Sequence, residues 1–67
     1  MLKATIKFKD VYGNNRQRTI QVEKNEPNSI IREFLCQCKL PKWIYVKTVK
    51  CGRTEYQWFG VAKDAIG

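Results

Sequence analysis

Residues 43–61, WIYVKTVKCGRTEYQWFGV, contain the pattern that decides the fold. Two runs rich in β-branched and aromatic residues, about 43–50 and 54–62, flank the tetrapeptide CGRT. The central pair Gly52-Arg53 suits a two-residue turn with glycine in its first position. The stretch therefore predicts a β-hairpin in which Cys51 faces Thr54. Extended along both strands, the same register predicts four further pairs: Lys50 with Glu55, Thr48 with Gln57, Val46 with Phe59, and Ile44 with Val61.

Strict alternation along this hairpin sorts its side chains into two faces. One face is predicted to carry plain apolar side chains, namely Ile44, Val46, Phe59 and Val61. The other is predicted to carry Trp43, Tyr45, Lys47, Val49, Cys51, Tyr56 and Trp58. The first set suits a core, because none of its side chains has a polar atom that needs a partner.

Two other arrangements of this hairpin stay open. A three-residue loop would pair Val46 with Trp58 and Tyr45 with Phe59, which mixes the two faces. The reverse assignment of faces would place the rings in the core. It would also bury Lys47 among them without a partner, which is costly.

The N-terminal part of the chain predicts a second hairpin. Residues 2–9, LKATIKFK, alternate between apolar and polar residues, as in a half-buried strand. The turn-forming residues of DVYGNN follow. Residues 16–24, RQRTIQVEK, then predict a strand with Ile20 and Val22 facing inward.

Residues 29–39 predict a single helix that covers one face of the sheet. Its apolar residues form one helical stripe: Ile30, Ile31, Phe34, Leu35 and Cys38. Pro27 suits the first turn, and Asn25 or Asn28 can cap the start. The proline that follows Leu40 is expected to end the helix.

These elements predict an α+β fold in one domain, residues 1–67, with the order β-β-α-β-β. A four-stranded antiparallel sheet with strand order 2-1-3-4 keeps all neighbouring strands antiparallel. With one helix available, the second face of the sheet is expected to stay open. The last residues, KDAIG, are expected to fray.

The charge balance is basic, and two interpretations fit it. Thirteen Lys and Arg against six Asp and Glu give a net charge of +7 in 67 residues. This charge fits solubility, and it also fits an acidic partner such as nucleic acid. The N-terminus does not resemble a signal peptide, and no stretch is apolar enough for a membrane helix. We therefore expect no membrane association and a cytoplasmic protein from a bacterium, a phage or a mobile element.

Catalysis and cofactor binding are not expected from this sequence. It contains no histidine, the commonest general base, and its four glycines form no phosphate-binding loop. The three cysteines, an odd number, indicate reduced thiols. Cys36 and Cys38 lie two residues apart on the predicted helix, so they cannot bind a metal together. We expect a non-enzymatic protein with no metal and no cofactor.

The open sheet face is the candidate site, and single-stranded DNA or RNA is the predicted partner. Flat rings offer bases a stacking surface, and nearby cations neutralise phosphates. The predicted stacking residues are Tyr45, Tyr56 and Trp58, and the predicted phosphate contacts are Lys3, Lys7, Arg16, Arg18, Lys47 and Lys50.

Each part of this site also has a purely structural interpretation. The lysines of residues 2–9 are typical of any solvent-facing strand. Tyr56 and Trp58 suit a cross-strand cluster that only stabilises the hairpin, and Trp43 suits a cap on the core edge. The alternative function is a protein-interaction module that uses the same face. It would form a homodimer, or regulate or inhibit a host protein in the manner of phage and mobile-element proteins.

Overall fold

The computed structural model describes residues 1–66. Its elements are β1 (Leu2–Lys9), β2 (Asn15–Val22), α1 (Pro27–Cys38), β3 (Tyr45–Cys51), β4 (Thr54–Val61) and a short 3-10 helix, η1 (Ala62–Ala65). The strands form one antiparallel sheet in the order β2-β1-β3-β4. The predicted α+β class, element order and strand order are therefore confirmed.

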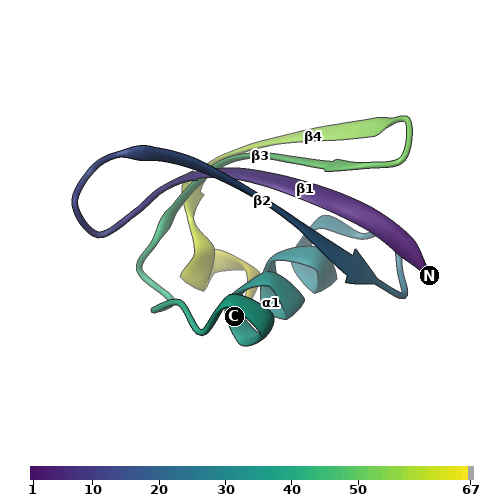
Figure 1. Cartoon of the computed structure of the whole chain (residues 1–67), viewed down its shortest axis with the longest axis horizontal. Coiled ribbons are helices and arrows are strands. Elements are labelled where there is room, and N and C mark those ends of the chain that lie inside the picture. Colours follow the sequence, from purple (N-terminus) through teal and green to yellow (C-terminus); the bar gives the residue numbers. More distant parts are fainter. Residues whose placement is uncertain (67) are drawn as a thin grey trace.

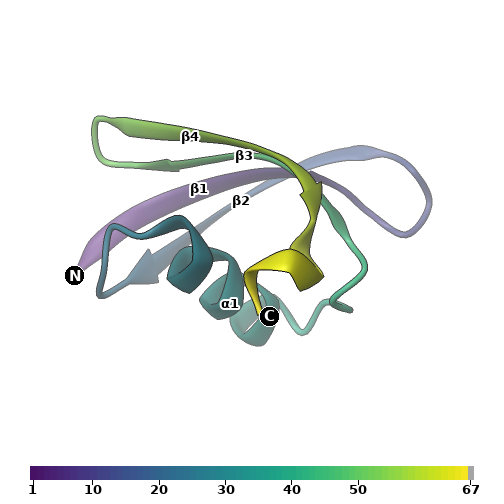
Figure 2. The same ribbon diagram turned by 180° about the vertical axis from the view of Figure 1, so that it is seen from behind.

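The sheet has one covered and one open face. In Figure 1, α1 and η1 both lie beneath the sheet, and none of the described elements lies over its upper face. The same arrangement is seen from behind in Figure 2. The β1–β2 and β3–β4 turns project at opposite ends of the sheet. Among residues 1–66, no helix is long and apolar enough to cross a membrane.

The core lies between α1 and the covered face. The buried side chains of α1 are Ile30, Ile31, Phe34 and Leu35, with Cys38 half-buried beside them, so the predicted stripe is confirmed. Phe34 packs against Phe8 of β1 with ring centroids 4.8 Å apart and planes tilted by 59°. Such a tilted pair stabilises the helix on the sheet beyond the area it buries.

The helix boundaries differ slightly from the prediction. α1 begins at Pro27, which occupies the first turn as predicted, and the capping residue is Glu26 with no side-chain cap. The expectation that Asn25 or Asn28 caps the helix is therefore wrong. The helix ends because Lys39 adopts the left-handed conformation, with φ 52°.

An irregularity in β3 decides which side chains reach the core. Lys7 of β1 pairs with Thr48, but the next residue, Phe8, pairs with Val46, so Lys47 is an extra residue in β3. This β-bulge reverses the alternation of the strand. Val46 and Val49 are three residues apart and are nevertheless both fully buried.

The predicted hairpin register is confirmed only near the turn. The pairs from Cys51–Thr54 to Thr48–Gln57 are as predicted. Beyond Lys47 the pairing shifts, so Val46 lies opposite Gly60 and Tyr45 lies opposite Val61. Between Thr48–Gln57 and Val46–Gly60, β4 has one residue more than β3, so the predicted pairs Val46–Phe59 and Ile44–Val61 are wrong.

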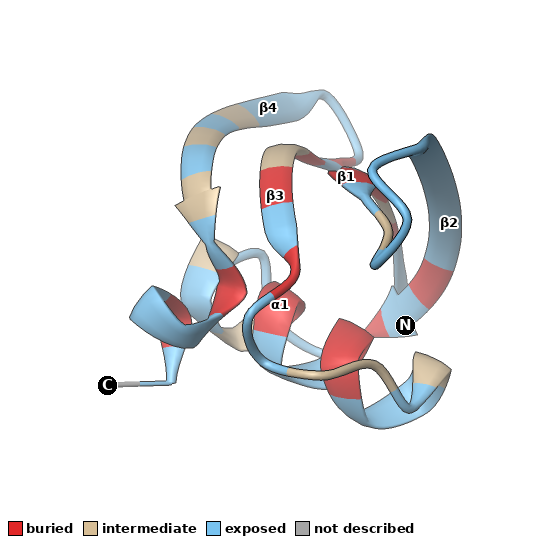
Figure 3. Ribbon diagram, turned by 90° about the vertical axis from the view of Figure 1, so that its left-hand side faces the viewer, coloured by how far each residue is buried: buried red, intermediate tan, exposed pale blue. Residues whose placement is uncertain are grey.

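The same bulge corrects the predicted faces. Ile44 and Val46 are buried, as predicted. Six assignments are wrong: Val49 and Cys51 are buried, Phe59 and Val61 are exposed, and Tyr56 and Trp58 pack half-buried against the core on the helix side. Figure 3 shows half-buried and exposed residues alternating along β4. The bulge adds Val49 and Cys51 to the core beside Val46, and a fully buried valine contributes roughly 1.5–3 kcal/mol.

The C-terminus is ordered further than predicted. The residues expected to fray include most of η1, in which Ala62 and Ala65 are buried. The Ala62 amide donates a hydrogen bond of 2.8 Å to the carbonyl oxygen of Ile44. Gly67, the last residue of the predicted frayed segment, lies outside the described residues.

Candidate functional site

The open face carries a concentrated positive charge on its two central strands. Alternation along β1 and the bulge in β3 direct five lysines to this face: Lys3, Lys7, Lys9, Lys47 and Lys50. Glu55 is the one acidic residue in the four strands. It lies opposite Lys50, as predicted, yet the two side chains form no ion pair. Within residues 1–66 the one ion pair joins Arg16 and Asp10, so the five lysine charges have no carboxylate partner.

Hydroxyl and amide side chains surround these lysines. Lys7 and Lys50 line a shared hollow of about 290 Å³ together with Thr5, Gln17, Thr48 and Glu55. The Thr5 and Thr19 hydroxyl groups are 3.1 Å apart. Lys47 Nζ reaches across β1 and donates a hydrogen bond of 2.6 Å to Asn15 Oδ1 on β2. Lys47 is thereby held over the face.

The structure brings five of the predicted site residues together and separates four. Lys3, Lys7, Tyr45, Lys47 and Lys50 share the open face. The remaining four are Arg16, Arg18, Tyr56 and Trp58, and alternation places them on the helix side of the sheet.

Arg16 and Arg18 instead support the β2 edge and its turn. Arg16 Nε donates to Asp10 Oδ2 at 3.0 Å, and Arg18 Nη1 donates to the Gln17 carbonyl oxygen at 3.0 Å. Both guanidinium groups therefore have protein partners on the margin of the sheet. Their predicted role as phosphate contacts at the hairpin tip stays a prediction, and the structure places them apart from the five lysines of the open face.

Tyr56 and Trp58 have structural contacts. Tyr56 Oη lies 3.2 Å from the Asn25 carbonyl oxygen and 3.0 Å from Asn25 Oδ1, which ties β4 to the loop before α1. Trp58 Nε1 donates to the Val61 carbonyl oxygen at 3.3 Å. Their predicted position beside Tyr45 is wrong, because the bulge turns this half of the hairpin over. The interpretation that they form a cross-strand cluster stays a prediction, because these hydrogen bonds join Tyr56 to the loop before α1 and Trp58 to its own strand.

Asp10 organises the β1–β2 turn. Its carboxylate accepts hydrogen bonds from the amides of Asn14 and Tyr12, each at 2.9 Å, and from Arg16. The Asn14 amide, together with Arg16 and Tyr12, lowers the pKa of Asp10 below its ordinary value of 3.8. The Asp10 carboxylate is therefore already engaged within its own turn.

The sequence prediction and the structure differ at two exposed residues. Lys9 was expected on the open face but was not predicted as a site residue, and Phe59 was assigned to the core although it is 58% exposed. The sequence carries two hints of an irregularity in this hairpin, although neither fixes the faces. Apolar residues at 46, 49 and 51 break a period of two, and a glycine within a strand, Gly60, often marks a bulge.

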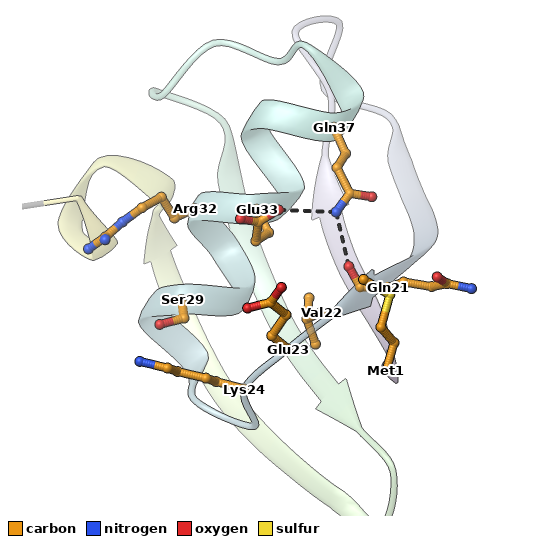
Figure 4. A pocket seen from close by; sticks show the side chains of 9 residues that line it. All are labelled: Met1, Gln21, Val22, Glu23, Lys24, Ser29, Arg32, Glu33 and Gln37. Carbon is orange, nitrogen blue, oxygen red and sulfur yellow. Dashed lines mark hydrogen bonds between the residues drawn. The ribbon is translucent and has the colours of Figure 1, made fainter.

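A second hollow, on the helix side, has a different character. It has a volume of about 290 Å³ and lies between the end of β2 and α1 (Figure 4). Its lining mixes Glu23 and Glu33 with Lys24 and Arg32. Gln37 Nε2 crosses it to the Gln21 carbonyl oxygen at 3.0 Å, which protects the edge of β2. The mixture of charges gives this hollow no preference for an anion.

Comparison with protein-family models, with curated proteins and with solved structures found no match to this chain.

Proposed function

We propose that this protein is a non-catalytic nucleic-acid-binding protein that holds single-stranded DNA or RNA on its open sheet face. The observation that carries the proposal is the projection of five lysines, none with an ion-pair partner among residues 1–66, from two central strands onto one uncovered face. Lysine ammonium groups neutralise phosphates and release counterions, a term that dominates non-specific binding to nucleic acid.

The shape of the face supports a flexible, single-stranded partner. Lys3 and Lys9 are six residues apart on β1, which corresponds to about 20 Å along a strand. The surrounding hydroxyl and amide groups can donate to sugar and phosphate oxygens. α1 is occupied with the core, so it is not available as a recognition helix for the major groove of a duplex.

Binding of a labelled single-stranded oligonucleotide at two salt concentrations tests this proposal. In the site variant, Lys3, Lys7 and Lys50 are replaced by Gln. In the control variant, Lys24, Lys39 and Lys63 are replaced by Gln; these exposed lysines lie in the loop before α1, at its C-terminus and in η1. Both variants have net charge 7 − 3 = +4, so they differ only in where charge is lost.

We expect the site variant to bind at least tenfold more weakly and the control variant to keep most of its affinity. Loss of three phosphate contacts should also reduce the slope of log K against log salt by about 2. Equal losses in both variants, or no binding by the native protein at low salt, would refute a dedicated nucleic-acid face. Formation of a dimer that hides the lysine face would favour the protein-interaction alternative.

A further inference from the structure

An aromatic groove lies at the end of the lysine face, beside the β1–β2 turn. It has a volume of about 310 Å³ and is lined by Lys9, Asp10, Val11, Gly13, Trp43, Ile44 and Tyr45. Trp43 is 69% exposed and Tyr45 is 38% exposed. Two neighbouring exposed rings that border one groove form a contiguous apolar surface of the kind that marks a binding site.

The register of the sheet makes this groove continuous with the lysine face. Tyr45 lies between Lys9 on β1 and Val61 on β4. Lys9 therefore belongs both to the lysine face and to the groove. A strand that follows the lysines along β1 reaches the rings of Tyr45 and Trp43 next.

The charge around the groove favours an anionic occupant. Asp10 is the one acidic residue in its lining, and its carboxylate already accepts hydrogen bonds from two amides and from Arg16. Lys9 lies in the groove and Lys42 precedes Trp43 in the chain. An apolar surface bordered by cations suits a base whose own phosphates carry negative charge.

We propose that Trp43 and Tyr45 form a stacking site for an unpaired base of the strand held on the lysine face. This inference rests on the proposed function and adds a subsite to it. Stacking requires a base whose faces are free, so the groove selects single strands over duplexes. Because every base has a π face, such a site accepts many sequences.

A comparison of two probes tests the subsite with the native protein. One probe is an oligothymidylate, and the other is an abasic deoxyribose-phosphate strand of the same length and charge. Both probes offer the lysines the same number of phosphates, and only the oligothymidylate carries bases. We expect the oligothymidylate to bind about tenfold more tightly. Equal affinity for the two probes would overturn the stacking site while leaving the lysine face intact.

Single-tryptophan variants locate the contact. Trp58→Phe leaves Trp43 as the reporter, and Trp43→Phe leaves Trp58. We expect oligothymidylate to quench the fluorescence of Trp43 and to leave that of Trp58 nearly unchanged, because Trp58 lies on the helix side. Quenching of Trp58 alone would place the base elsewhere and overturn the assignment.

Truncation of the ring completes the test. Trp43→Ala should remove the preference for oligothymidylate over the abasic strand, and Ile66→Ala, which trims an exposed side chain outside the groove, should retain it. Failure of every probe to bind would instead refute the proposed function itself. A fluorescence change of Trp43 that depends on protein concentration alone would assign the groove to a second copy of the chain, against our proposal.

Discussion

Phe59 has an unusual backbone conformation at the point where the pairing of β3 and β4 shifts. It lies in β4 with φ 46°, a left-handed conformation that costs a residue with a Cβ atom roughly 1–2 kcal/mol. Its ring is largely exposed, so little packing offsets this cost. The strain persists because the neighbouring pairs, Thr48–Gln57 and Val46–Gly60, fix the backbone on both sides.

At position 59 we expect glycine to be more stable than alanine, which is the reverse of the usual order in a β-strand. In a regular strand, Gly is less stable than Ala by roughly 0.5–1 kcal/mol. At φ 46° the Cβ atom of Ala is strained, so we expect Phe59→Gly to be more stable than Phe59→Ala by about 1 kcal/mol. Urea unfolding of both variants measures the difference. A more stable alanine variant would show that this backbone is regular.

Asp10 gives the turn a dependence on pH. Because its folded pKa is below the unfolded value of 3.8, its contribution to stability is present above that pH. The contribution is lost as the pH falls through the folded pKa. We expect the Asp10 carboxyl to titrate with a midpoint below 3.8 by NMR. The Asn14 and Tyr12 amide resonances should shift with the same midpoint, and a midpoint at or above 3.8 would contradict the turn geometry.

The bulge in β3 determines which side chains of this strand lie in the core and which lie on the open face. Without Lys47 as an extra residue, alternation from Val46 would turn Thr48 inward and Val49 outward. The observed strand instead buries Val49 and Cys51 and keeps Thr48 beside the lysines. The same shift removes Tyr56 and Trp58 from the open face, so a structural need of the core determines the composition of the candidate site.

Two alanine variants test which side chains of β3 face the core. Val49 is fully buried, so Val49→Ala should lower the free energy of unfolding by about 2 kcal/mol through lost burial and a residual cavity. Thr48 is half-buried on the other face, and Thr48→Ala should change it by less than about 0.5 kcal/mol. Urea unfolding provides both values. A larger loss of unfolding free energy for Thr48→Ala than for Val49→Ala would indicate that side chains alternate along β3 without a bulge.

At the scale of the whole molecule, one sheet face is sealed and the other is left to solvent. The helix and η1 together close the apolar side, and Ala62 and Ala65 complete the cover at the end that α1 does not reach. No buried polar or charged residue occurs within residues 1–66. The lysines are therefore concentrated on the open side because the other side is fully used for folding.

The contribution of η1 to this cover is open to a direct test. Ala65 is 3% exposed, so Ala65→Glu should bury a charge without a partner and lower stability by more than about 2 kcal/mol. Ile66→Glu, at an exposed neighbour, is the matched control and should have little effect. Thermal unfolding followed by circular dichroism distinguishes them. Equal stability of the two variants would mean that the C-terminal residues do fray.

The α+β class, the strand order, the helix stripe and the lysines of β1 could all be predicted from the sequence. Each of these depends on local periodicity or on the short list of connections that an antiparallel sheet allows. The lysines of residues 2–9 alternate with apolar residues that lie in the core. The alternation of the strand therefore places these lysines on the open face.

Only the tertiary structure decided the faces of the second hairpin and the position of the aromatic groove. A shift of one residue reverses every side chain beyond it, and whether a strand accepts that shift depends on which arrangement fills the space under α1. The groove likewise joins Lys9 and Val11 to Trp43 and Tyr45, which are more than thirty positions apart in the chain. Long-range packing, which no local pattern encodes, brings them together.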